Sequence, residues 1–149
     1  MILKAKNIFA RKKKIGLALG GGAVLGAAHI GVLRALEELK VPVTHIAGCS
    51  IGAFVGALYA FGKTSAEIED MAQDINWMDI TRITLSQYAL LSNKKMRNVL
   101  DQTIGDVSIE QAKYPLIIIA TDISSGEKVE LTKGDVASAV MASTCIPGI

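Results

Sequence analysis

Short apolar runs alternate with amphipathic segments at the start of the chain. The first apolar run, residues 14–19, stops at three glycines, which is typical of a buried strand that ends in a tight loop. Residues 27–40 carry one isoleucine and three leucines at helical spacing and end before Pro42, which predicts an amphipathic helix. A second strand is predicted over 43–48, and a helix buried nearly all round is predicted over 51–62. This order predicts an α/β fold in which helices pack on a parallel sheet.

The second half of the chain continues the α/β pattern. Residues 115–123 form a run of isoleucine and leucine behind a proline, which predicts a central strand covered on both faces. The pattern leaves 76–93 ambiguous and predicts four further elements: a helix over 65–75 with Ser65 as its N-cap, a helix over 94–105, an edge strand over 127–132, and a helix over 135–143 with Asp135 as its cap. No repeat or linker divides the chain.

Composition is that of a globular protein. Half of the 149 residues are hydrophobic and a fifth are charged, and a chain of this length can bury one substantial core. Only two cysteines occur, Cys49 and Cys145, and there is no Cys/His cluster. This usage predicts free thiols in a reducing compartment, and no metal site.

Basic residues gather near the N-terminus. Residues 1–36 hold seven lysines or arginines and no acidic residue, whereas the remainder holds nine basic and fourteen acidic residues. The basic arm over 1–13 either lies on an anionic membrane, at about 1 kcal/mol per basic residue near the surface, or is a solvated tail; the sequence leaves both open. Nucleic-acid binding is not expected, because the basic patch is terminal and carries a single aromatic, Phe9.

The stretch that follows the arm carries no formal charge. These residues, 15–33, resemble a signal peptide or a membrane span in length and apolarity. Six glycines argue against both, because each glycine costs about 1 kcal/mol relative to alanine inside a helix, and His29 adds a polar group. We therefore expect a cytoplasmic protein, peripheral at the inner membrane surface if the arm binds lipid.

Ser50 lies between Gly48 and Gly52, where the second predicted strand turns into a helix. A G-x-S-x-G pattern at such a turn lets the backbone pass close by and leaves the hydroxyl exposed above a helix N-terminus. The context favours Ser50 as a nucleophile, and the alternative is a helix-capping serine. Cys49 is interpreted as a small buried residue, because the turn points it away.

The glycine run at 20–22 exposes backbone N–H groups toward an anion. A Walker-type phosphate loop needs Gly-Lys-Ser/Thr at its end, and none follows. A dinucleotide-binding loop needs an acidic residue about twenty positions later, and residues 45–50 hold none. An oxyanion hole beside Ser50 explains both glycine features, since parallel neighbouring strands end at the same edge of the sheet.

Three segments together resemble the patatin-like phospholipase family in order and spacing: LALGGGAVLGAAHIGVLRALEE, HIAGCSIGAFVGALYAFG and IIIATDISSGEKVEL. The resemblance covers about residues 14–149. It implies a three-layer α/β sandwich with a mainly parallel central sheet. It also implies a serine acyl hydrolase of lipids or simpler esters that uses a Ser–Asp dyad, with no catalytic histidine and no cofactor.

The resemblance assigns roles to particular residues. Ser50 is the nucleophile between the elbow glycines Gly48 and Gly52, and the amides around Gly21, Gly22 and Ala23 form the oxyanion hole. The family usually has Arg or Lys where this chain has Leu25, so a positive charge near the anion is lost while the amides remain. The two histidines, His29 and His45, are interpreted as packing or capping residues.

The family's catalytic aspartate is the second departure. It belongs to an Asp-Gly motif beyond a segment resembling ASTCIPGI, and no Asp-Gly pair occurs in these 149 residues. Asp122 is the best internal substitute, although a turn-capping role fits it better. Taken with the resemblance, the sequence implies a basic arm over 1–13 and a partial domain over 14–149 that ends before the final strands and is nearly inactive alone. The alternative function is a non-catalytic module that binds an anion or a lipid headgroup.

Overall fold

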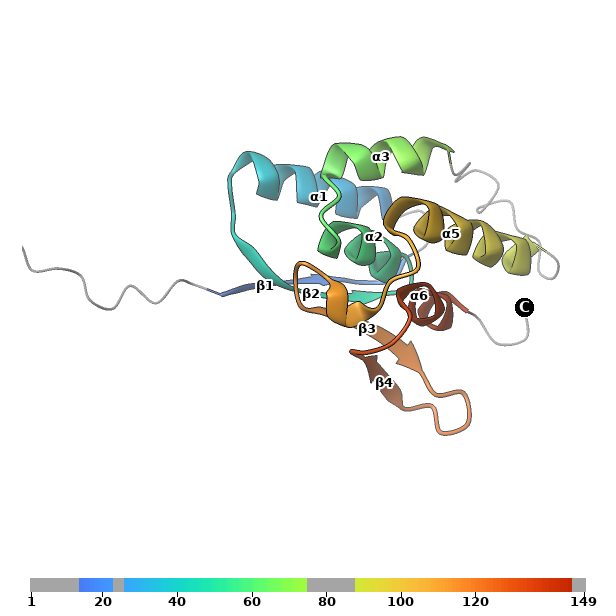
Figure 1. Ribbon diagram of the computed structural model, residues 1–149. Helices are drawn as coiled ribbons and strands as arrows, with labels where there is room; N and C mark the ends of the chain where they lie inside the picture. Colours follow the sequence, from blue (N-terminus) through green and yellow to red (C-terminus); the bar gives the residue numbers. More distant parts are fainter. Residues whose placement is uncertain (1–13, 23–25, 75–87, 146–149) are drawn as a thin grey trace, which may run out of the picture.

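The computed structural model describes residues 14–22, 26–74 and 88–145 (Figure 1). The basic arm expected over 1–13, the site residues Ala23 and Leu25, and most of the ambiguous segment 76–93 lie outside the described residues. The uncharged stretch that resembled a membrane span divides between a strand, the glycine loop and a helix. Within the described ranges, no helix is both long and apolar enough to cross a bilayer.

The predicted strands and helices are present in the predicted order. The strands are β1 (Ile15–Leu19), β2 (Val43–Cys49), β3 (Leu116–Thr121) and β4 (Lys128–Leu131). The helices are α1 (Gly26–Glu38), α2 (Ile51–Ala60), α3 (Ser65–Asp74), α5 (Tyr88–Ile104) and α6 (Val136–Thr144), with a short 3-10 helix, η2 (Ile109–Gln111). The largest difference is that α5 begins six residues before the predicted 94–105.

The strands form one sheet in the order β1-β2-β3-β4. β1, β2 and β3 are mutually parallel and β4 lies at the edge of the sheet, as predicted, and β4 pairs antiparallel with β3. Leu19 pairs with Gly48 and Cys49 pairs with Ile119, so the carboxyl ends of the three parallel strands meet at one edge of the sheet. The glycine loop and Ser50 both follow strands that end there.

The helices lie on one side of this sheet. A sequential parallel order with right-handed crossovers places each connecting helix on the same face, and Figure 1 shows α1, α2, α3 and α5 on one side of the strands. α6 packs against β3, α2 and α5. The described residues therefore supply the sheet of the expected three-layer sandwich and the helices on one of its faces.

The prediction that the central strand is covered on both faces is wrong for the described residues. Leu116, Ile118 and Ala120 of β3 are buried beneath the helices, whereas Ile117 and Ile119 on the other face are partly exposed. The reason is that the described helices cover only one face of the sheet. An apolar run looks the same in sequence whether one or both faces of its strand are covered.

Helix α2 is the centre of the core. Nine of its ten residues are buried, which confirms the prediction of a helix enclosed nearly all round. Its small residues bring the helix close to the sheet: a Cβ atom added at Gly56 would lie 3.2 Å from the Ile46 side chain. The nucleophile candidate therefore stands at the start of the most enclosed helix in the described chain.

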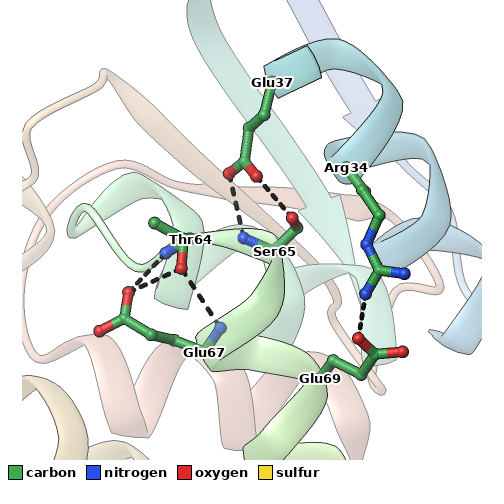
Figure 2. Close-up of polar contacts among 6 residues, drawn as sticks. All are labelled: Arg34, Glu37, Thr64, Ser65, Glu67 and Glu69. Carbon is green, nitrogen blue, oxygen red and sulfur yellow. Dashed lines mark hydrogen bonds and ion pairs between the residues drawn. The ribbon is translucent and has the colours of Figure 1, made fainter.

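The N-cap of α3 differs from the prediction. Thr64, rather than Ser65, caps the helix: its hydroxyl accepts from the Glu67 N–H at 3.2 Å, and the Glu67 carboxylate accepts from the Thr64 N–H at 2.8 Å (Figure 2). This reciprocal pair is a capping box. Ser65 is instead buried, and both its N–H and its hydroxyl donate to the carboxylate of Glu37 on α1. The Thr64 hydroxyl thus caps α3, and the Ser65 hydroxyl joins α3 to α1.

Asp135 caps α6 as predicted, since its carboxylate accepts from the Ser138 N–H at 2.6 Å. The Ser138 side chain, the Ser138 N–H and the Arg97 guanidinium lower the pKa of Asp135 below its ordinary value of 3.8. A lowered pKa stabilises the fold above the unfolded-state value, and this contribution is lost as the pH falls through the folded-state value.

We expect the Asp135→Asn variant to keep the cap but to lose this pH dependence, because asparagine also caps helices and does not titrate. Thermal melts from pH 6 downward should show wild type above the variant, with the gap closing below about pH 4. A gap that stays constant to pH 3 would contradict the assignment of this titration to Asp135.

Candidate active site

Ser50 occupies the turn between β2 and α2 in an unusual backbone conformation. Its φ is 54° and its ψ is −124°, and in the described residues only Lys40 is a further non-glycine residue with positive φ. Such a conformation costs a side-chain-bearing residue about 1–3 kcal/mol and is concentrated at functional sites. It is also the strained strand-to-helix turn that a nucleophile elbow requires.

The Ser50 hydroxyl does not cap α2. The residue stands at the N-cap position, but its side chain makes no capping hydrogen bond. Only the Ser50 backbone carbonyl takes part, accepting from the N–H groups of Ala53 at 2.8 Å and Phe54 at 3.2 Å. The first N–H groups of α2 have no acceptor within the helix, so the hydroxyl stands beside the partial positive charge of a helix N-terminus.

Gly48 and Gly52 allow the tight turn at Ser50, between β2 and α2, to form. A Cβ atom at Gly48 would lie 2.5 Å from the Gly52 carbonyl oxygen and 2.6 Å from Ala53 Cα. A Cβ atom at Gly52 would lie 2.2 Å from the Leu19 carbonyl oxygen, at the end of β1. All of these neighbours are backbone atoms, which cannot rotate away as side chains do. Both positions are therefore restricted to glycine by contact, and neither has positive φ.

The glycine loop lies against the elbow. A Cβ atom at Gly21 would lie 3.5 Å from Ser50 Cβ and 3.9 Å from the Cys49 carbonyl oxygen. Gly22 follows with a φ of 152°, in a region open mainly to glycine. Two of the three residues expected in the oxyanion hole, Gly21 and Gly22, therefore belong to the loop that borders Ser50. The third, Ala23, is outside the described residues.

Neither histidine hydrogen-bonds to Ser50. His29 Nε2 lies 2.9 Å from the Gly20 carbonyl oxygen, and because a carbonyl only accepts, this nitrogen carries the proton and donates. The bond ties α1 to the start of the glycine loop. His45 is exposed and bonds to the neighbouring Thr44 hydroxyl. No three His, Cys, Asp or Glu side chains within the described segments form a group that could hold a metal ion.

Asp122 has its carboxylate engaged in the turn between β3 and β4. Its Oδ1 accepts from the N–H groups of Ser124 at 2.8 Å and Ser125 at 3.1 Å. The N–H groups of Ser125 and Ser124 lower the pKa of Asp122, so that it is ionised and stabilised as a turn acceptor. A general base works best with a pKa near the working pH. The hydrogen bonds therefore describe a structural role for Asp122.

Ser143 is a site residue that the sequence analysis did not single out. Its hydroxyl oxygen accepts from the backbone N–H of Ser50 at 2.7 Å and lies 2.5 Å from the carbonyl oxygen of Ile119 on β3. It is contributed by α6, 93 positions along the chain from Ser50. Nothing in the local pattern around Ser143 indicates this contact, because it depends on how α6 meets the sheet.

A family model described as patatin-like phospholipase matches residues 17–149, which is most of the chain. The chain belongs to the patatin-like phospholipase family. An uncharacterized NTE family protein of Mycobacterium tuberculosis is 35% identical over 139 residues, covering 91% of this chain and 38% of that protein. The neuropathy target esterase of Drosophila melanogaster is 33% identical over 140 residues, covering 90% of this chain and 10% of that protein. The chain thus spans well under half the length of these relatives.

Solved structures support the fold of this patatin-like chain. The type III effector protein ExoU matches with a TM-score of 0.57 at 17% identity, covering 91% of this chain and 40% of that one. ExoU in its complex with SpcU from Pseudomonas aeruginosa matches with a TM-score of 0.62 at 19% identity, over 91% of this chain and 37% of that one. The α/β fold expected from the sequence is therefore confirmed as patatin-like.

Proposed function

We propose that this chain carries the nucleophile and the oxyanion-binding loop of a serine hydrolase that acts on lipid esters or other carboxylic esters. The observation that carries the proposal is the conformation of Ser50. The residue is held at a φ of 54° with a hydroxyl that caps nothing, and the glycine loop borders it at Gly21. A purely structural serine at a helix start would instead use its hydroxyl as a cap.

The proposed reaction has two steps, acylation of Ser50 and hydrolysis of the acyl-enzyme. The Ser50 oxygen attacks the ester carbonyl carbon while its proton passes to a carboxylate base. Amides of Gly21, Gly22 and Ala23, with the N-terminus of α2, stabilise the negative charge that develops on the carbonyl oxygen. The alcohol leaves with the proton, and an acyl group remains on Ser50. Water then attacks this acyl-enzyme through the same base, which releases the acid and restores Ser50.

We assign the base to an aspartate outside these 149 residues. Within the described ranges no carboxylate hydrogen-bonds to the Ser50 hydroxyl, and Asp122 is engaged by the N–H groups of its own turn. Loss of one member of such a catalytic set lowers the rate by about 10⁴ to 10⁶. Residues 1–149 alone should therefore hydrolyse esters very slowly.

The relatives support an ester substrate. The family model is described as a phospholipase, and the matched Drosophila proteins are named esterases. An ester that reaches Ser50 has to place its carbonyl oxygen about 3 Å from the loop amides. The same requirement applies to a phospholipid and to a simpler ester, so the chemistry is shared between them.

A fluorophosphonate probe tests the proposal on the whole gene product that contains this chain. We expect covalent labelling that peptide mapping assigns to Ser50, and loss of labelling in Ser50→Ala. Ser124→Ala is the matched control, because Ser124 is an exposed serine in the β3–β4 turn, and it should be labelled like wild type. A folded whole protein that resists the probe would support a binding module instead, and labelling that persists in Ser50→Ala would place the nucleophile elsewhere.

A further inference from the structure

The Ser143 hydroxyl stands between two backbone groups at the end of the β2–β3 ladder. The Ser50 N–H can only donate and the Ile119 carbonyl can only accept, so the directions of both bonds are fixed. The hydroxyl oxygen accepts from Ser50, and the hydroxyl proton goes to Ile119. Ser143 is partly buried, which limits exchange of either bond for one to water.

This position is where the next bond of the parallel ladder would form. The Ile46 N–H donates to the Pro115 carbonyl at 2.9 Å, and in a parallel pair such bonds recur evenly at every second residue. Four residues further along each strand, the same pattern would join the Ser50 N–H directly to the Ile119 carbonyl. The structure shows the Ser143 hydroxyl inserted between these two groups.

The insertion separates β2 from β3 at the residue where the chain leaves the sheet. A direct bond from Ser50 to Ile119 would continue β2 as a strand, and an extended strand residue has negative φ. With the hydroxyl in between, the Ser50 amide remains satisfied while the backbone turns to a φ of 54°. The orientation of this peptide unit, together with φ, sets the direction of the Ser50 Cα–Cβ bond.

We propose that Ser143 is the positioning residue of the elbow: its hydroxyl replaces one bond of the sheet ladder and so holds Ser50 in the conformation that presents its hydroxyl. This role rests on the proposed function, because it matters for catalysis only if Ser50 is the nucleophile. The Ser143 hydroxyl bonds to the backbone groups of Ser50 and Ile119. It acts through the backbone of Ser50.

The test compares three variants at α6 in the whole gene product. Ser143→Ala removes the hydroxyl, Ser143→Thr keeps it, and Ser138→Ala removes an exposed hydroxyl of the same helix that interacts with Arg97 and Asp135, away from Ser50. We expect Ser143→Ala to lower kcat and the rate of fluorophosphonate labelling about 10- to 100-fold with little change in KM, because a small misplacement of a reacting group has an effect of this size. Ser143→Thr should restore most of the rate, and Ser138→Ala should match wild type.

A crystal structure of Ser143→Ala provides a readout that does not depend on activity. We expect the Ser50 N–H to move toward the Ile119 carbonyl and the φ of Ser50 to leave the positive region. If the alanine variant does not fold, Ser143→Cys takes its place, since a thiol is similar in size and a much weaker hydrogen-bonding group.

The outcomes separate this role from the proposed function. Equal labelling of wild type and Ser143→Ala, or an unchanged Ser50 backbone in the variant, would overturn the positioning role and leave the hydrolase proposal standing. A Ser143→Thr variant as slow as Ser143→Ala would also overturn it, because the hydroxyl would then not be the group that matters. A folded wild type that is not labelled at all would overturn both.

Discussion

Replacing Ser50 with glycine is expected to abolish ester hydrolysis and, at the same time, to stabilise the fold. The loss of the nucleophile should lower kcat by about 10⁴ to 10⁶. Glycine adopts a φ of 54° without steric cost, which removes a strain of about 1–3 kcal/mol. The greater freedom of glycine in the unfolded chain takes back about 1 kcal/mol. A net gain of up to about 2 kcal/mol remains.

Ser50→Ala is the matched control for the Ser50→Gly prediction. Alanine lacks the hydroxyl but keeps a Cβ atom, so the variant should be equally inactive without the gain in stability. Urea unfolding and hydrolysis of a soluble ester, measured on all three proteins, separate the two effects. If glycine and alanine at position 50 give the same midpoint, the backbone strain at Ser50 is not present in solution. Hydrolysis that survives in either variant would rule out Ser50 as the nucleophile.

The second large effect is expected for Gly52→Ala. The new Cβ atom would lie 2.2 Å from the Leu19 carbonyl oxygen and 2.5 Å from that of Gly20, so either β1 or the start of α2 has to move. Overpacking of a well-packed core costs about 1–3 kcal/mol, and a clash with two backbone oxygens should fall at or above the top of that range. Loss of activity should accompany the loss of stability, because the displaced atoms border Ser50.

Gly31→Ala provides the comparison for the Gly52→Ala variant. Gly31 is an exposed residue of α1, and a Cβ atom added there meets no atom within 4 Å. Alanine should stabilise α1 by up to about 1 kcal/mol through its helix propensity. Thermal midpoints should therefore shift in opposite directions for these two glycine-to-alanine changes. Gly52→Ala with a midpoint equal to that of wild type would show that the contact with β1 is looser than the structure indicates.

The secondary structure could be predicted from sequence because its signals are local. The apolar runs of β1, β2 and β3 and the helical spacing in α1 fix each element within a few residues. The error at the start of α3 also had a local signal: Thr64 and Glu67 form the T-x-x-E pattern of a capping box, and Ser65 is simply the neighbouring hydroxyl. The coverage of β3 had no such signal, because burial depends on which layers are present.

In the candidate site too, the features with a local sequence signal could be predicted and the others could not. Gly48, Ser50 and Gly52 are close in sequence, so their pattern at a strand-to-helix turn could be recognised without a structure. The approach of Gly21 to Ser50 follows from two parallel neighbouring strands that end at one edge. The contact of Ser143 could not be predicted, because it depends on the exact packing of α6 and on one hydroxyl that enters a ladder 93 positions away.

The contact of Gly52 with the end of β1 has a consequence for how relatives of this chain can be recombined. Gly52 contacts the backbone of Leu19 and Gly20, and Gly26 contacts the Ile51 side chain. The end of β1 and the start of α1 therefore pack directly against the start of α2. Chimeras that exchange residues 15–60 as a single block should keep this fit. A crossover inside the block, between α1 and β2, would combine β1 and α1 from one relative with β2 and α2 from another, so the contacting residues would no longer come from the same protein.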